Sequence, residues 1–249
     1  MQYLYCENKN FEDLASGRVI YGGCGIPNFS VRLLNEIFGR CLQYTRRKDD
    51  LAVYDPCCGG GYSLTVLGFC HADRISALYG SDIEPRMVEQ AKKNTELLTK
   101  AGLEKRIAQL QALYTEYHKE SHREALLSAE RLAEKSCKEI PSQIMQADAT
   151  KPLAVRWTPN VIITDVPYGN LVSWEGGENE PLYQMLETLA GISDEGTVLA
   201  VSMDKKQSVR HAAWKRLEKQ QIGKRKFEIY LKETEIVNCV DCVNVKRKI

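Results

Sequence analysis

The chain has 249 residues, of which 43% are hydrophobic and 27% charged, a composition typical of a globular protein with a sizeable core. The formal net charge of +1 neither requires nor excludes a polyanionic partner, so the position of the charges has to decide that question. Nine cysteines without a disulfide-like arrangement, no signal-peptide pattern and no long apolar run predict a cytoplasmic protein without a membrane span.

Residues 1–50 form an N-terminal extension ahead of the first predicted strand. Within it, apolar residues at helical spacing predict a helix over Val31–Gln43, and Ser30 is placed to cap its N-terminus.

From residue 51 onward, predicted strands alternate with predicted helices. Five strands are expected in chain order at Leu51–Tyr54, Ile75–Tyr79, Gln143–Gln146, Val161–Thr164 and Thr197–Ser202. Phe227–Leu231 and Glu235–Val240 predict a closing antiparallel hairpin. The expected fold is therefore α/β and Rossmann-like: one domain over residues 1–249 with a seven-stranded, mostly parallel sheet, whose ligands bind beyond the carboxyl ends of the strands.

The interval between the second and third strands is longer than one helix requires. Residues 96–140, approximately, are rich in Glu, Lys, Ala and Leu, and predict a helical insert. Two interpretations stay open: a solvated helical hairpin packed on the sheet, or an appendage that faces the substrate.

A glycine-rich turn follows the first strand, with the sequence Asp-Pro-Cys-Cys-Gly-Gly-Gly-Tyr from residue 55. It lacks the Gly-Lys-Ser/Thr of a phosphate-binding loop, and Leu64 stands where a dinucleotide fingerprint needs a small residue. The remaining pattern, Asp-x-x-x-Gly-x-Gly, is that of S-adenosylmethionine-dependent methyltransferases. The residues expected to bind the amino-acid half of that cofactor are Asp55, Cys57, Gly59 and Gly61.

Two further acids end the next strands. Asp82 is placed to accept both ribose hydroxyls of the cofactor, and Asp148 to accept from its adenine amino group. Glu84, close to Asp82, is expected to help start the following helix.

The fourth strand leads into Asp165-Val-Pro-Tyr, which resembles the Asp/Asn-Pro-Pro-Tyr motif of methyltransferases that modify planar nitrogen groups. Asp165 and Pro167 are expected to hold the target nitrogen while Tyr168 stacks on the base. Trp174 either closes over a flipped base or packs on the surface. The acid at position 165 favours guanine, attacked at ring N1 or exocyclic N2. The alternatives are DNA adenine, a protein glutamine, or an RNA-binding protein without catalysis.

Basic residues cluster after the fifth strand. Nine of them lie between Asp204 and Lys226 against two acids, which indicates an RNA phosphate backbone or, alternatively, a solvated basic helix. The substrate contacts expected from this run are Lys205, Lys206 and Arg210. No metal site is expected, because the only metal-like spacing, Cys239 to Cys242, has no second pair of ligands.

Together, these motifs resemble the avilamycin-resistance type of 23S ribosomal RNA guanine methyltransferase. The resemblance rests on the sequence blocks Gly-Ile-Pro-Asn-Phe-Ser-Val-Arg-Leu from residue 25, Glu-Ile-Phe from 36, the glycine turn, Thr-Asp-Val-Pro-Tyr-Gly from 164 and Trp-Glu-Gly from 174. It implies methylation of guanine, at ring N1, in 23S rRNA or a precursor of the large ribosomal subunit. We expect the enzyme to act as a monomer.

Overall fold

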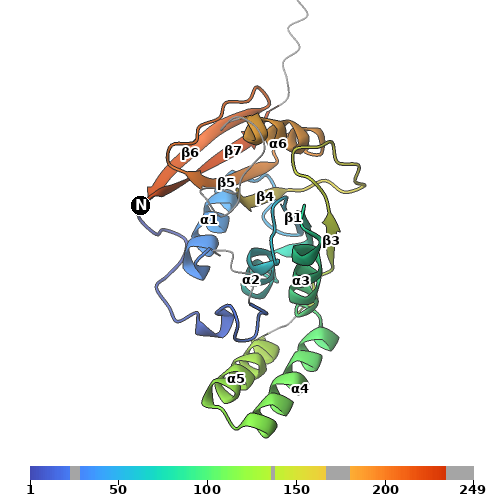
Figure 1. The fold of residues 1–249 in the computed structure, drawn as a ribbon. Coiled ribbons are helices and arrows are strands. Elements are labelled where there is room, and N and C mark those ends of the chain that lie inside the picture. The colour runs from blue at the N-terminus through green and yellow to red at the C-terminus, as the bar shows by residue number, and fades with distance from the viewer. Residues whose placement is uncertain (23–28, 136–137, 167–179, 234–249) are drawn as a thin grey trace, which may run out of the picture.

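The computed structural model describes residues 1–22, 29–135, 138–166 and 180–233. Its centre is a seven-stranded sheet of order β3-β2-β1-β4-β5-β7-β6 (Figure 1). The first five strands are parallel, and β7 runs antiparallel to both β5 and β6. In chain order the strands are β1 Leu51–Asp55, β2 Ile75–Asp82, β3 Ser142–Gln146, β4 Val161–Asp165, β5 Val198–Asp204, β6 Trp214–Ile222 and β7 Arg225–Lys232. The predicted mostly parallel, Rossmann-like sheet is confirmed.

Helices cover both faces of this sheet because successive side chains of a buried strand point to opposite faces. On one face α1, α2 and α3 share a core with alternate strand residues such as Val53 and Ile163. On the other face α6 packs against residues such as Tyr54 and Ile162. The helices are α1 Val31–Tyr44, α2 Tyr62–Cys70, α3 Pro85–Glu96 and α6 Glu180–Gly191. The predicted helix in the extension is thus confirmed, and the hydroxyl of Ser30 accepts from the Leu33 N–H at its start.

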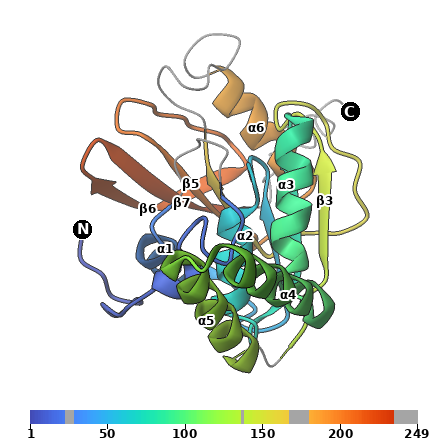
Figure 2. The same ribbon diagram turned by 60° about the horizontal axis from the view of Figure 1, so that its bottom comes forward.

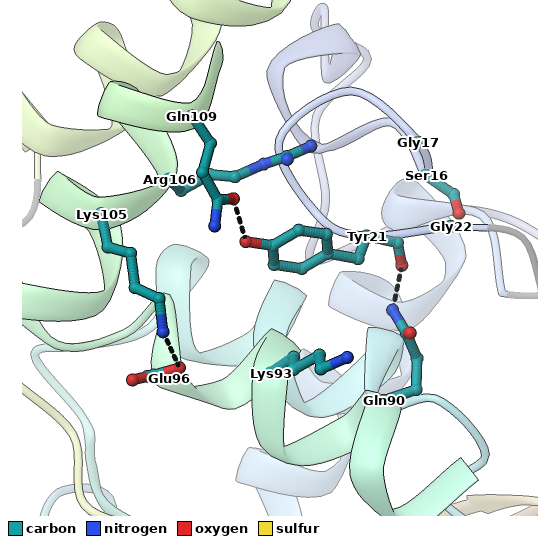
Figure 3. A pocket seen from close by; sticks show the side chains of 10 residues that line it. All are labelled: Ser16, Gly17, Tyr21, Gly22, Gln90, Lys93, Glu96, Lys105, Arg106 and Gln109. Carbon is teal, nitrogen blue, oxygen red and sulfur yellow. Dashed lines mark hydrogen bonds and ion pairs between the residues drawn. The ribbon is translucent and has the colours of Figure 1, made fainter. Parts of the chain in front are cut away.

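The helical insert is a hairpin of α4 Lys100–Tyr117 and α5 Glu120–Lys135. The hairpin packs on the N-terminal extension, where α5 contacts the short helix η1 Glu12–Leu14. Arg131 of α5 forms an ion pair with Asp13 of η1. In Figure 1 the hairpin lies at the opposite end of the molecule from β6 and β7, and Figure 2 brings it forward. The extension, α3 and α4 together enclose a cleft of about 500 Å³ (Figure 3).

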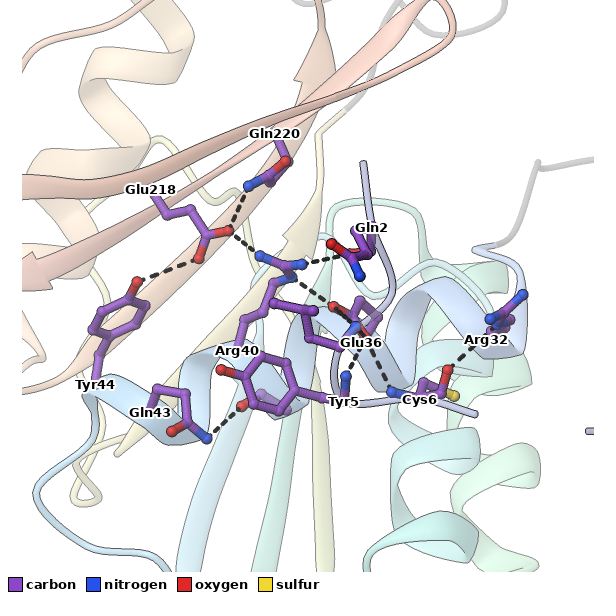
Figure 4. Close-up of polar contacts among 12 residues, drawn as sticks. Gln2, Tyr5, Cys6, Arg32, Glu36, Arg40, Gln43, Tyr44, Glu218 and Gln220 are labelled. Atoms are coloured by element: carbon purple, nitrogen blue, oxygen red, sulfur yellow. Dashed lines mark hydrogen bonds and ion pairs between the residues drawn. The ribbon is translucent and has the colours of Figure 1, made fainter. Parts of the chain in front are cut away.

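A buried ion cluster joins the extension to the edge of the sheet (Figure 4). The Glu36 carboxylate, fully buried, accepts from three successive backbone N–H groups, those of Leu4, Tyr5 and Cys6, at 2.7–3.0 Å. Burial alone would raise the pKa of Glu36, but these donors and Arg40 hold it below its usual value. Arg40 also pairs with Glu218 on β6.

The closing hairpin differs from the prediction. Phe227–Leu231 lies in a strand, β7, as predicted, and this strand forms a hairpin with β6, which the sequence did not predict; Glu235–Val240 lies outside the described residues. The sequence does not predict β6 within the basic run, because β6 is an edge strand whose exposed positions carry charged and amide side chains. Its apolar periodicity is therefore weak. The run is therefore a loop and a β-hairpin, not a solvated helix. Within this run Lys226 is buried, and its Nζ donates to Oε1 of the buried Glu228 at 2.7 Å.

Gly61 should be among the least replaceable residues of the fold. It adopts φ +75°, and an added Cβ would lie 2.8 Å from the Cα of Ala91 on α3. We expect Gly61→Ala to lower the free energy of unfolding by about 2 kcal/mol or more. The matched control is Gly223→Ala, at φ +59° with no atom within 4 Å, which should cost only about 1 kcal/mol of backbone strain. Urea unfolding of both variants measures the difference; equal losses would contradict the role of the α3 contact.

Candidate active site

Four acids come together at the carboxyl edge of the sheet. Asp55, Asp82 and Asp165 are the last residues of β1, β2 and β4, which are neighbours in the sheet order β2-β1-β4. Asp148 follows β3 by two residues, on the next strand outward. The sequence prediction that these acids share one edge is therefore matched by the topology, and this is where ligands bind in sheets of this kind.

The glycine turn after β1 is fixed by backbone hydrogen bonds. Cys58 N–H donates to Ser81 O at 2.9 Å, and Gly61 N–H to Cys58 O at 2.8 Å. Gly59 has φ +51° and donates its N–H to the Asp82 carboxylate at 2.9 Å. Burial raises the pKa of the Cys57 thiol, so this side chain stays neutral. The turn thus presents glycine backbone, without side chains, next to two carboxylates.

Asp55 is a buried carboxyl, 3% exposed, on the β1 side of the turn. Its Oδ1 accepts from the Cys57 N–H at 3.1 Å. Burial raises the pKa of Asp55 to about 7; the hydrogen bond from the Cys57 N–H opposes the shift, and the nearby charge of Asp82 adds to it. A buried acid of this kind is stabilised in its ionised form by a cation beside it, such as the ammonium of an amino acid.

Asp82 and Asp148 are more accessible acceptors. One oxygen of Asp82 accepts from Gly59 and the other from the Glu84 N–H at 3.0 Å, so each keeps a lone pair for a hydroxyl. Burial would raise the pKa of Asp148, but hydrogen bonds from the Thr150 N–H and hydroxyl, at 2.9 and 2.7 Å, hold it below its usual value. Glu84 caps the N-terminus of α3, as predicted.

Asp165 makes contacts that the sequence did not reveal. Its carboxylate pairs with Arg225 on β7, and the same guanidinium nitrogen donates to the Ser202 hydroxyl at 2.7 Å. The guanidinium also lies 5.6 Å from the ring centre of Phe29, which precedes α1 in the extension. Arg225 belongs to the run predicted to bind RNA phosphates, but it instead points at the predicted catalytic acid. No sequence pattern links two residues sixty positions apart.

The remaining predicted residues divide into two groups. Pro167, Tyr168 and Trp174 lie outside the described residues. Lys205, Lys206 and Arg210 are exposed in the segment that follows β5, next to the same carboxyl edge. Over the part of the chain that the structure describes, no His/Cys/Asp/Glu group could hold a metal ion. No helix among those residues is long and apolar enough to cross a membrane.

A Rossmann-like sheet with a glycine turn after β1 and acids at successive strand ends defines a class I methyltransferase. Within that class the chain matches the rRNA methyltransferase AviRa family over residues 1–225, and it belongs to this family. It is 36% identical over 228 residues to the 23S rRNA (guanine(2535)-N(1))-methyltransferase of Streptomyces viridochromogenes, covering 88% of this chain and 91% of that one. Two solved structures of rRNA methyltransferase AviRa from the same organism align with a TM-score of 0.82 and 35% identity, covering 90% of this chain and 94% of theirs.

The raised pKa of Asp55 predicts a specific dependence of stability on pH. An acid with a higher pKa in the folded than in the unfolded state stabilises the fold at low pH, and this contribution is lost as pH rises from about 4 to about 7. Asp55→Asn should therefore be more stable than the wild type at about pH 8, by up to about 4 kcal/mol.

Urea unfolding of both proteins at several pH values tests this dependence. The stability difference should shrink towards zero near pH 4 and level off above about pH 7, because only the wild type carries the Asp55 carboxyl. A difference that does not vary with pH would contradict the buried, titrating carboxyl.

Proposed function

We propose that this methyltransferase transfers a methyl group from S-adenosylmethionine to ring N1 of a guanine in 23S rRNA. The observation that carries the proposal is the ion pair of Asp165 with Arg225, at the same sheet edge as the predicted cofactor residues. The relative from Streptomyces viridochromogenes, named for guanine N1 methylation, supports the choice of base and atom.

The residues present fit the cofactor. Asp55 is a buried acid suited to its ammonium, Asp82 has free acceptor sites for its ribose hydroxyls, and Asp148 is an ionised acceptor for its adenine amino group. Gly59 and Gly61 leave the turn without side chains on that side. When bound, S-adenosylmethionine supplies an electrophilic methyl carbon that accepts a nitrogen lone pair as its bond to sulfur breaks.

Asp165 and Arg225 supply what guanine N1 needs. The N1 lone pair becomes available only when the N1–H proton leaves, and the negative charge that remains spreads onto O6 of the base. We assign Asp165 to accept this proton and Arg225, which carries five N–H donors, to donate to O6. An acceptor and a donor side by side thus match the N1–H and O6 of one guanine edge. Pro167 and Tyr168 are proposed to hold the base at its other side.

Identifying the methylated product distinguishes the alternatives. Exocyclic N2 of guanine also offers N–H groups to Asp165, and the same acceptor–donor pair fits the N6–H and N1 of adenine. A protein glutamine offers a planar amide, but the exposed Lys205, Lys206 and Arg210 suit phosphates better than a protein surface. A non-catalytic RNA-binding protein would not need the acid series. The proposed setting is the cytoplasm, with a monomer acting on 23S rRNA or its precursor particle, where free thiols such as Cys6 and Cys58 stay reduced.

Asp165→Ala is expected to abolish methyl transfer, by about a thousandfold or more, and to leave cofactor affinity nearly unchanged because Asp165 faces the base rather than the cofactor. Transfer of labelled methyl to 23S rRNA, followed by mass spectrometry of the digested nucleosides, measures both rate and product. N1-methylguanosine is expected from the wild type. Normal turnover by the variant would refute the assignment of Asp165, and N2-methylguanosine or N6-methyladenosine would refute that of the target atom.

Arg225→Met should lower kcat by about a hundredfold, because it removes the donor to O6 and releases the Asp165 carboxylate. Arg225→Lys should recover part of the loss, since it restores the charge without the planar fork. The matched control is Lys224→Ala, one residue earlier in the exposed turn, which should keep kcat. Single-turnover methylation at saturating RNA makes the comparison. A normal kcat in Arg225→Met would show that this guanidinium serves only the fold.

A further inference from the structure

One cleft lies apart from the glycine turn, between the extension, α3 and α4 (Figure 3). Its volume, about 500 Å³, falls in the range of sites that hold a small ligand or one unit of a polymer. It exists only because this chain adds an extension and a helical insert to the methyltransferase sheet. The residues that matter for its chemistry are Tyr21, Gln90, Lys93, Glu96, Lys105 and Gln109.

Tyr21 is an aromatic side chain held rigidly in the cleft. Its backbone N–H donates to the Asn94 side chain at 2.8 Å, and its hydroxyl donates to Gln109 at 2.7 Å. The guanidinium of Arg106 lies 4.2 Å from its ring centre and is itself fixed by hydrogen bonds to the carbonyls of Val19 and Arg18. A ring fixed in this way loses little entropy when a flat group stacks on it.

The polar groups around the ring suit a nucleotide. The Lys93 ammonium is exposed and forms no hydrogen bond or ion pair with the other described residues, and the Lys105 ammonium lies 3.8 Å from a carboxylate oxygen of Glu96. With Arg106 the lining has three cations against one acid. Gln90 and Gln109 each use one end of their amide on Tyr21, which leaves an acceptor and a donor for the edge of a base.

One buried side chain connects this cleft to the cofactor turn. The amide nitrogen of Asn94, 1% exposed, donates both to Tyr21 O at 3.1 Å and to Gly60 O at 2.7 Å. Lys93 lies eight residues along α3 from its N-terminus at the carboxyl edge, a rise of about 12 Å. A group bound in the cleft is therefore held by the same helix that positions the glycine turn.

We propose that this cleft binds one nucleotide of the rRNA substrate that flanks the target guanine. Its base stacks on Tyr21, and its phosphate lies between Lys93 and Lys105. The inference rests on the proposed function, because it takes RNA as the substrate, and it assigns to the extension and the insert the placement of that RNA.

The test is binding of an unmodified 23S rRNA transcript to the full chain at several salt concentrations. Lys93→Ala/Lys105→Ala should weaken binding by about tenfold to a hundredfold and make the salt dependence less steep by about one phosphate contact, because both lysines face the same phosphate. The matched control, Lys92→Ala/Lys100→Ala, removes exposed lysines from the same two helices outside the cleft and should change affinity little.

Tyr21 provides a second, independent measurement. Tyr21→Leu should weaken RNA binding at least about fivefold, whereas Tyr21→Phe keeps the ring and should stay within about twofold of the wild type. In both lysine and tyrosine variants KM for RNA should rise while kcat, cofactor affinity and the thermal unfolding midpoint stay close to the wild type.

The outcomes separate the two proposals. If the wild type methylates 23S rRNA but the Lys93/Lys105 variant binds it as tightly as the control, the cleft proposal is overturned and the proposed function stands; this is also the result expected if a protein occupies the cleft. If the wild type neither binds nor methylates 23S rRNA, both are overturned. A loss of RNA affinity confined to the cleft variants supports the proposal.

Discussion

The contact between the glycine turn and α3 is the constraint on which the rest of the site depends. Gly61 approaches Ala91 so closely that no side chain fits between them, and Asn94, one helical turn further along α3, donates to the carbonyl of Gly60. The helix therefore sets the position of the turn, while Asp82 holds its other side through Gly59. Because α3 also carries Gln90 and Lys93 into the cleft, the proposed cofactor site and the proposed RNA contact share one rigid element.

The basic residues of the run between Asp204 and Lys226 fall into two groups: some are paired with acids inside the protein, and others are exposed to solvent. Lys226 neutralises the buried Glu228, and Arg225 faces Asp165, so neither is available to a phosphate backbone. Unpaired buried charges are costly, which explains why each of these two basic residues lies against an acid. The prediction of RNA binding that was made for the whole run is therefore left to its exposed members, such as Lys205 and Arg210.

The sequence predicted those features that depend on local pattern. Short apolar runs that end in acids located β1, β2 and β4 and placed Asp55, Asp82 and Asp165 at one edge, because parallel strands share their direction. β6 escaped detection since an edge strand with charged positions has little apolar periodicity. The ion pair of Asp165 with Arg225 and the cleft around Tyr21 both form between segments that are far apart in the chain. No local sequence pattern predicts which distant segments come together.

The extension and the insert explain how a common sheet can serve one particular RNA. Glu36 on α1 accepts hydrogen bonds from the first residues of the chain and so holds them against this helix. Arg40, also on α1, forms an ion pair with Glu218 on the hairpin that carries Arg225. At the other end Asp13 ties the extension to α5 through Arg131. The extension therefore contacts both the hairpin beside the proposed catalytic acid and the helical insert, and charged pairs hold it at both places. A substrate that touches the hairpin and the cleft would meet surfaces whose relative position is already fixed, which lowers the entropic cost of placing the target base.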